Sequence, residues 1–148
     1  TGCRLLLATE IDPAAAAMTG STCHDFLEGL PGGWPRPDAI VGNVPFSDAA
    51  AHFMVSFKAA TELVAYITQA CRHHRNGPEW LKVWAAAWPD EILALGRVSF
   101  DGPGRDHGGK SAMTDCEVLI FRKRRGSWVG RGITRRMFED GSIYPPKE

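Results

Sequence analysis

Short apolar runs alternate with segments of helical spacing along most of this sequence, and this alternation limits the choice of folds more than any other feature. Residues 5–8, 38–41 and 63–67 form runs short enough for buried parallel strands. After Ser47 the apolar residues recur at helical spacing instead: Ala50, Phe53, Met54, Phe57 and Ala60. Strands and helices in this order predict an α/β fold built on a mostly parallel sheet.

Two further helices are predicted from their ends. Asp12 and Pro13 suit the N-cap and the first position of a helix. A second helix, over residues 80–87, is expected to end at Pro89.

The C-terminal part of the sequence predicts more strands. Residues 92–100 and 115–122 are expected to pair as an antiparallel hairpin. In the tail we expect a strand at Trp128–Val129 and a short helix near Arg135.

The length of 148 residues suits a single domain, with 1–123 as its core and 124–148 as a basic C-terminal extension. With 44% hydrophobic and 23% charged residues, the composition is globular. No apolar stretch approaches the roughly 20 residues of a membrane-spanning helix, and no signal-peptide layout begins the sequence. The four cysteines form no Cys-x-x-Cys pair and the five histidines show no ligand spacing. We therefore expect a cytoplasmic protein with reduced thiols and no metal site.

Charge is unevenly distributed along the chain. Residues 1–96 hold six Lys or Arg against ten Asp or Glu, whereas residues 97–136 hold ten against four. The last third is therefore the candidate surface for a polyanion. The residues expected to contact phosphates are Arg122, Lys123, Arg124, Arg125 and Arg131. The alternative is a strand end with a solvated, charged turn.

The most informative segment runs from Asp38 to Ser47, where a strand meets a polar residue, a proline and an aromatic before a helix begins. Such a strand end lies at the carboxyl edge of an open sheet, where ligands bind. The Asn43 amide oxygen and the Val44 carbonyl can together accept two hydrogen bonds from one planar amine. Pro45 stiffens the turn, and Phe46 offers a flat face on which a base can stack. The alternative is an Asn-initiated turn with a core-packed Phe.

Two acidic residues lie at other strand ends. Glu10 can accept hydrogen bonds from both hydroxyls of a ribose, or it is a solvated edge residue. Asp12 is explained by helix capping alone. Asp25 suits the N-cap of a short helix at Phe26–Leu27.

The 43–46 segment resembles the Asn/Asp/Ser-Pro-Pro-aromatic motif of amino-methyltransferases that modify adenine in DNA. Residues 8–13 resemble the acidic strand end of that family, and 24–27 its Asp-aromatic pair. Three later segments are similar to phage and prophage adenine methyltransferases: 97–102, 109–111 and 115–121. The resemblance covers roughly residues 4–123, and the relative order of its motifs is more specific than any one of them.

This resemblance implies a Rossmann-like methyltransferase fold that uses S-adenosylmethionine to methylate the exocyclic amine of adenine in DNA. It implies catalytic roles for Asn43, Val44, Pro45 and Phe46. It implies cofactor-binding roles for Glu10, Ile11, Asp25 and Phe26.

Two departures from the family pattern accompany the resemblance. Val44 stands where the family has its first proline, a position that contributes mainly its carbonyl. Only nine residues precede Glu10, so we expect an N-terminally incomplete fold without the Gly-rich cofactor loop. An absent first strand exposes apolar surface, so we expect a homo-oligomer with its interface at Leu5–Ala8. The alternative function is that of a degenerate, non-catalytic domain that binds DNA or a partner protein.

Overall fold

A computed structural model describes residues 4–70, 77–98, 114–137 and 143–144. Its helices are α1 (Pro13–Thr19), the 3-10 turn η1 (Phe26–Glu28), α2 (Ala49–Ala59) and α3 (Pro78–Ala86). Its strands are β1 (Thr9–Glu10), β2 (Thr22–Cys23), β3 (Ala39–Asn43), β4 (Leu63–Gln69), β5 (Glu91–Val98), β6 (Thr114–Arg124), β7 (Ser127–Trp128), β8 (Ile133–Met137) and β9 (Ile143–Tyr144). Within these ranges, no helix is long and apolar enough to cross a membrane.

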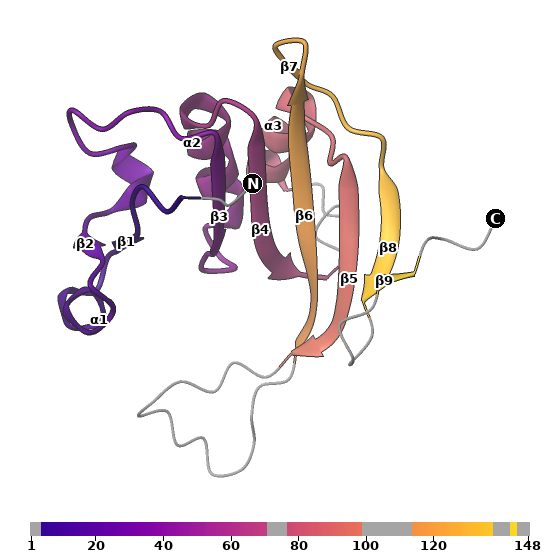
Figure 1. Ribbon diagram of the computed structural model, residues 1–148. Coiled ribbons are helices and arrows are strands. Elements are labelled where there is room, and N and C mark those ends of the chain that lie inside the picture. The colour runs from indigo at the N-terminus through magenta and orange to yellow at the C-terminus, as the bar shows by residue number, and fades with distance from the viewer. Residues whose placement is uncertain (1–3, 71–76, 99–113, 138–142, 145–148) are drawn as a thin grey trace.

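A seven-stranded mixed sheet forms the centre of the molecule, in the order β3-β4-β6-β5-β8-β9 with β7 paired to β6 (Figure 1). The α/β class and the antiparallel β5–β6 hairpin are confirmed. Parallel pairing is less frequent than expected: it joins β3 to β4 and β5 to β8, whereas β6 is antiparallel to both β4 and β5. The reason is that β6 returns from β5 as a hairpin and inserts between β5 and β4, which places an antiparallel strand in the middle of the sheet.

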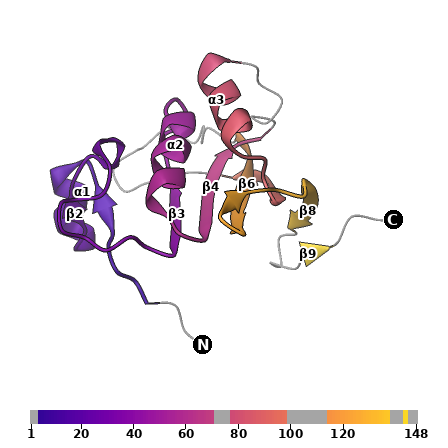
Figure 2. The ribbon, with the colours of Figure 1, turned by 90° about the horizontal axis from the view of Figure 1, so that it is seen from above.

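Helices α2 and α3 lie on the same face of this sheet (Figure 2). The inner face of α2 carries Phe53 and Phe57, and the sheet meets it with Val64, Tyr66 and Phe121; all are buried. The Phe53 ring is central: its centroid lies 5.0 Å from the ring centroid of Tyr66 and 5.0 Å from that of Phe121. The helical spacing seen in the sequence therefore does produce the apolar face that covers the sheet.

Several local predictions are confirmed by capping contacts. The Asp12 carboxylate accepts hydrogen bonds from the Ala14 and Ala15 amides at 2.7 and 3.2 Å, and α1 ends at Gly20 with a φ of 69°. The α3 helix ends before Pro89, and its Trp80 side chain is buried in the core.

Three sequence predictions are wrong. Leu5–Ala8 has no regular structure and Leu5 is 80% exposed; only Thr9–Glu10 forms a strand, in a separate two-stranded parallel sheet with β2. The β3 strand is not buried: Val41 is 69% exposed, since β3 is an edge strand and successive side chains alternate between its faces, with the neighbouring Ile40 packed against the core. Arg135 lies in strand β8 rather than in a helix, because that segment pairs with β5. Self-association through Leu5–Ala8 stays a prediction.

The aromatic core can be tested by truncating its central ring. We expect Phe53→Ala to lower the free energy of unfolding by about 3–5 kcal/mol, because the fully buried ring leaves a cavity that its neighbours only partly fill. Urea denaturation followed by circular dichroism measures the change. Met18→Ala, at a 79% exposed position, is the control and should change stability by less than about 0.5 kcal/mol.

Candidate functional site

The Asn43 motif lies at the carboxyl end of β3. Asn43 is exposed and is the last residue of the strand, in register with Ile67 of β4. The Val44 side chain is buried with the core residues beneath α2, and the Pro45 carbonyl accepts a hydrogen bond from the Asp48 amide at 3.0 Å. The turn is thus anchored by an apolar side chain, while Asn43 and Pro45 stay at the surface.

Behind the motif, β3 lies close against a fixed aromatic ring. A Cβ on Gly42 would be 3.3 Å from Cε1 of Tyr66, so the absence of a side chain allows this approach. The Tyr66 hydroxyl forms a 2.6 Å hydrogen bond with the Ser56 hydroxyl of α2. Burial raises the pKa of Tyr66 to about 12, although the Ser56 hydrogen bond lowers it. Tyr66 is therefore a neutral support for the motif.

The two acidic candidates lie at the ends of neighbouring parallel strands. Glu10 ends β1 in register with Cys23 of β2, and the His24 amide donates to the Glu10 carbonyl at 3.0 Å. One Glu10 oxygen accepts from the Asp12 amide at 3.1 Å, and one Asp25 oxygen accepts from the Leu27 amide at 2.9 Å. The N-cap role of Asp25 is confirmed. Each carboxylate keeps a second oxygen that has no hydrogen bond within the residues the structure describes.

Phe26 connects this pair of strand ends to the helix that follows the Asn43 motif. Its ring is parallel to the His52 ring of α2, with an interplanar angle of 2° and centroids 6.1 Å apart. The cofactor candidates Asp25 and Phe26 are therefore next to α2, the helix that begins directly after Asn43–Phe46. Two carboxylates can accept hydrogen bonds from the hydroxyl and amine groups of a nucleoside, and an aromatic ring can stack on its flat base, so these residues fit such a ligand. Ile11, the remaining cofactor candidate, is exposed.

His52 is a site residue that the sequence did not single out, because one histidine on a helix has no distinctive spacing. Burial lowers its pKa below the usual 6.5, while the charges of Asp48 and Asp25 act in the opposite direction. Its Nδ1 atom is buried and has no hydrogen-bond partner within the described part of the chain. The ring is therefore neutral at pH 7.

Most of the basic residues expected to contact phosphates pair within the protein. Three of them surround the carboxylate of Asp90, which is 0% exposed: Arg131 Nε at 3.0 Å, Arg124 Nη2 at 3.1 Å and Arg122 Nε at 3.3 Å. Burial by itself would raise the pKa of Asp90, but the hydrogen bonds from Arg131 and Arg124 lower it overall. Nothing in the local sequence marks Asp90 as the shared partner, since the arginines come from 32 to 41 residues further along the chain.

The other two basic residues differ in their surroundings. Lys123 Nζ lies 5.5 Å from the centroid of the Trp128 ring, and the Trp128 indole donates to the Phe57 carbonyl at 3.2 Å. Arg125 is exposed in the β6–β7 turn, where Arg125 and Gly126 both have positive φ, 51° and 84°.

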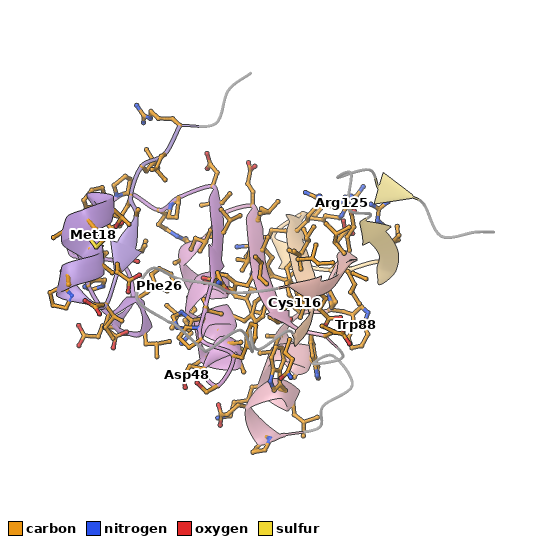
Figure 3. All side chains as sticks on the ribbon, turned by 90° about the horizontal axis from the view of Figure 1, so that it is seen from below. Met18, Phe26, Asp48, Trp88, Cys116 and Arg125 are labelled. Atoms are coloured by element: carbon orange, nitrogen blue, oxygen red, sulfur yellow. The ribbon has the colours of Figure 1, made fainter. Side chains whose placement is uncertain are left out.

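The structure does not bring the basic residues to the Asn43 motif. Asn43 is in register with Ile67, which pairs with Val118, whereas Arg122 pairs with Leu63 at the opposite edge of the sheet. Arg125 is well separated from Phe26 in Figure 3. The candidate site is therefore composed of the strand ends and α2, and the basic residues form a second region.

In the described ranges, no group of three or more His, Cys, Asp or Glu side chains is arranged to hold a metal ion. Cys23 is exposed and Cys116 is buried. The segments 99–102 and 109–111, part of the family resemblance, lie outside the described residues.

No protein-family model and no curated protein matches this chain. Among solved structures, the chain is similar to the crystal structure of the 23S rRNA methyltransferase ErmE, with 21% sequence identity and a TM-score of 0.47. The alignment covers 81% of this chain and 52% of ErmE, so the chain spans about half the length of that structure.

The Asp90 cluster makes a stability prediction. We expect Asp90→Asn to lower the free energy of unfolding at pH 7 by roughly 1–3 kcal/mol, because three arginines lose their shared anion and a buried amide replaces it. Glu79→Gln is the control, since its ion pair with Lys82 is exposed and contributes little.

The same cluster predicts a pH dependence. The pKa of Asp90 is lower in the folded protein than in the unfolded chain. Its carboxylate therefore contributes fully to the free energy of unfolding above the unfolded pKa of about 3.9. That contribution is lost as pH falls from there through the folded pKa. Urea titrations of wild type and Asp90→Asn should therefore converge at low pH. A constant difference between them would contradict the assignment.

Proposed function

We propose that this chain catalyses S-adenosylmethionine-dependent methylation of the exocyclic amine of adenine in DNA. The observation that carries the proposal is the placement of Asn43 at an open strand end, with Asp25 and Phe26 packed against the helix that begins just after it. A hydrogen-bond acceptor for an amine thereby lies just before α2, and a carboxylate and an aromatic face that can bind a nucleoside pack against the same helix.

In this mechanism the protein positions the amine and supplies no nucleophile. The Asn43 amide oxygen and the Val44 carbonyl each accept a hydrogen bond from one N–H of the amine. These bonds draw the nitrogen lone pair out of conjugation with the ring. They also stabilise the positive charge that develops on that nitrogen. S-adenosylmethionine, held by Glu10, Asp25 and Phe26, would supply the methyl group to the amine nitrogen and keep the C–S electron pair on its sulfur, and water would take the amine proton.

Two further groups of residues complete the proposed roles. A base inside a duplex must leave the stack to reach Asn43, and Phe46, with Pro45 stiffening its turn, is assigned to stack on it. Glu10 is assigned to the cofactor ribose, and Asp25 with Phe26 to the cofactor adenine. In each carboxylate one oxygen already caps a backbone amide, so the second oxygen is the one assigned to the ligand.

Methyl transfer is tested with radiolabelled S-adenosylmethionine and an adenine-containing duplex. We expect the label to be incorporated into DNA. Asn43→Ala should lower kcat about 10²–10³-fold, the usual loss when one hydrogen-bonding group that stabilises the transition state is removed. Val41→Ala, exposed on the same strand, is the matched control.

The outcomes separate the alternatives. Incorporation into single-stranded RNA but not DNA would contradict the DNA assignment while keeping the reaction. Binding of DNA with no incorporation, in a chain that also takes up no cofactor by calorimetry, would favour the non-catalytic binding domain.

The role of the basic residues is tested by salt titration. We expect Arg125→Ala to reduce the slope of log affinity against log salt by about 0.9 on duplex DNA, because its exposed charge is free to neutralise one phosphate. Arg124→Ala should change the slope less, since that guanidinium already pairs with Asp90.

Lys110→Ala provides the comparison, because Lys110 belongs to the 109–111 segment of the family resemblance. A change in slope for Lys110→Ala with none for Arg125→Ala would mean that the Arg125 turn is merely solvated.

A further inference from the structure

We infer that His52 is a positioning residue: its stacked contact with Phe26 fixes the Asp25–Phe26 segment against α2 and so sets where that segment lies relative to the Asn43 turn. This inference rests on the proposed function for its role, but the contact itself is a property of the fold.

His52 lies between two aromatic rings, and of these Tyr66 is held in place by contacts of its own. On one side its ring is parallel to Phe26 at 6.1 Å, and on the other its centroid is 6.3 Å from Tyr66 in an edge-on arrangement with an interplanar angle of 77°. Tyr66 is buried, bonded to Ser56 and in contact with Gly42 of β3. Contacts therefore run without interruption from Phe26 through His52 and Tyr66 to the strand that ends in Asn43.

The rest of the segment is loosely packed on α2. An open hollow of about 390 Å³ lies between the segment and the helix, with Leu27 and Leu30 on one side and Val55 and Ala59 on the other. Arg36, which also lines the hollow, ties the chain to α2: its guanidinium donates to the Lys58 and Ala59 carbonyls at 2.7 and 3.1 Å. The His52 stack is thus the anchor on the Asp25 side of the hollow.

The charges around the ring make this anchor sensitive to protonation. The titratable groups that act on His52 are Asp48 at the start of α2 and Asp25 beside η1, while Tyr66 of β4 stays neutral. A protonated ring would compete for the Asp25 carboxylate, which caps the Leu27 amide. Because burial holds the pKa of His52 below 6.5, the neutral stack is complete above about pH 6.5 and weakens as pH falls from there toward the lowered value.

Amide hydrogen exchange on the ligand-free protein tests this inference. The reporters are the Leu27, Glu28 and Gly29 amides, which bond to Asp25 Oδ1, the Asp25 carbonyl and the Phe26 carbonyl. We expect His52→Ala to speed their exchange about two- to tenfold, the worth of an aromatic pair, with amides of β4 and β6 changing less. His52→Phe should restore protection.

Acid pH supplies a readout that a merely space-filling role would not produce. After correction for intrinsic rates, exchange of these amides should rise between pH 7.5 and 5.5 in the wild type and stay level in His52→Phe. Unchanged exchange in His52→Ala, or the same pH response in both proteins, would overturn the inference.

Cofactor binding then separates this inference from the proposed function. We expect His52→Ala to raise the KM for S-adenosylmethionine more than it lowers kcat, and His52→Phe to recover the KM. If the wild type shows the expected exchange but binds no S-adenosylmethionine, the proposed function and the cofactor role of His52 are both overturned. If His52→Ala binds S-adenosylmethionine as well as the wild type does, only the role of His52 is overturned.

Discussion

The packing of α2 on the sheet is the contact on which the rest of the structure depends. Its inner face buries Phe53 and Phe57 against β4 and β6, and burial of aromatic side chains is the largest favourable term available to a domain of this size. Its other side holds Phe26 through His52. Since the Asn43 turn leads directly into its N-terminus, one helix places both parts of the candidate site, and loss of core packing would separate them.

Much of the fold could be predicted from the sequence because those features are local. The apolar spacing of α2, the short apolar run of β4 and the Asp12 and Asp25 caps depend on residues a few positions apart. The failures involve non-local partners. The Leu5–Ala8 run has the composition of a buried strand, but a strand forms only where a neighbouring strand supplies hydrogen bonds. Among the described residues, β1 pairs with β2 over two residues only.

The candidate site divides along the same line. Asn43 ends a strand and Asp25 caps η1, as the local sequence predicts, whereas the pairing of the arginines could not be read from composition. A cluster of basic residues predicts an anion-binding surface only if their side chains do not already pair with acidic groups of the protein. Here a single buried carboxylate, Asp90, collects three guanidinium groups, because an unpaired charge in that position would be prohibitively costly to bury.

The distance between the two regions constrains how a duplex would be held. Val118 is the β6 residue in register with Asn43, two strands across the sheet, and Arg125 follows it by seven residues. At about 3.3 Å per residue and 4.8 Å per strand, that separation is on the order of 25 Å. Phosphates along a duplex advance by about 3.4 Å per base pair, so Arg125 would meet the backbone about seven base pairs from an adenine at Asn43. Contacts nearer the target must then come from the edge where β3 ends. Under the proposed function, recognition of the base and capture of the distant backbone would therefore be separable properties of this sheet.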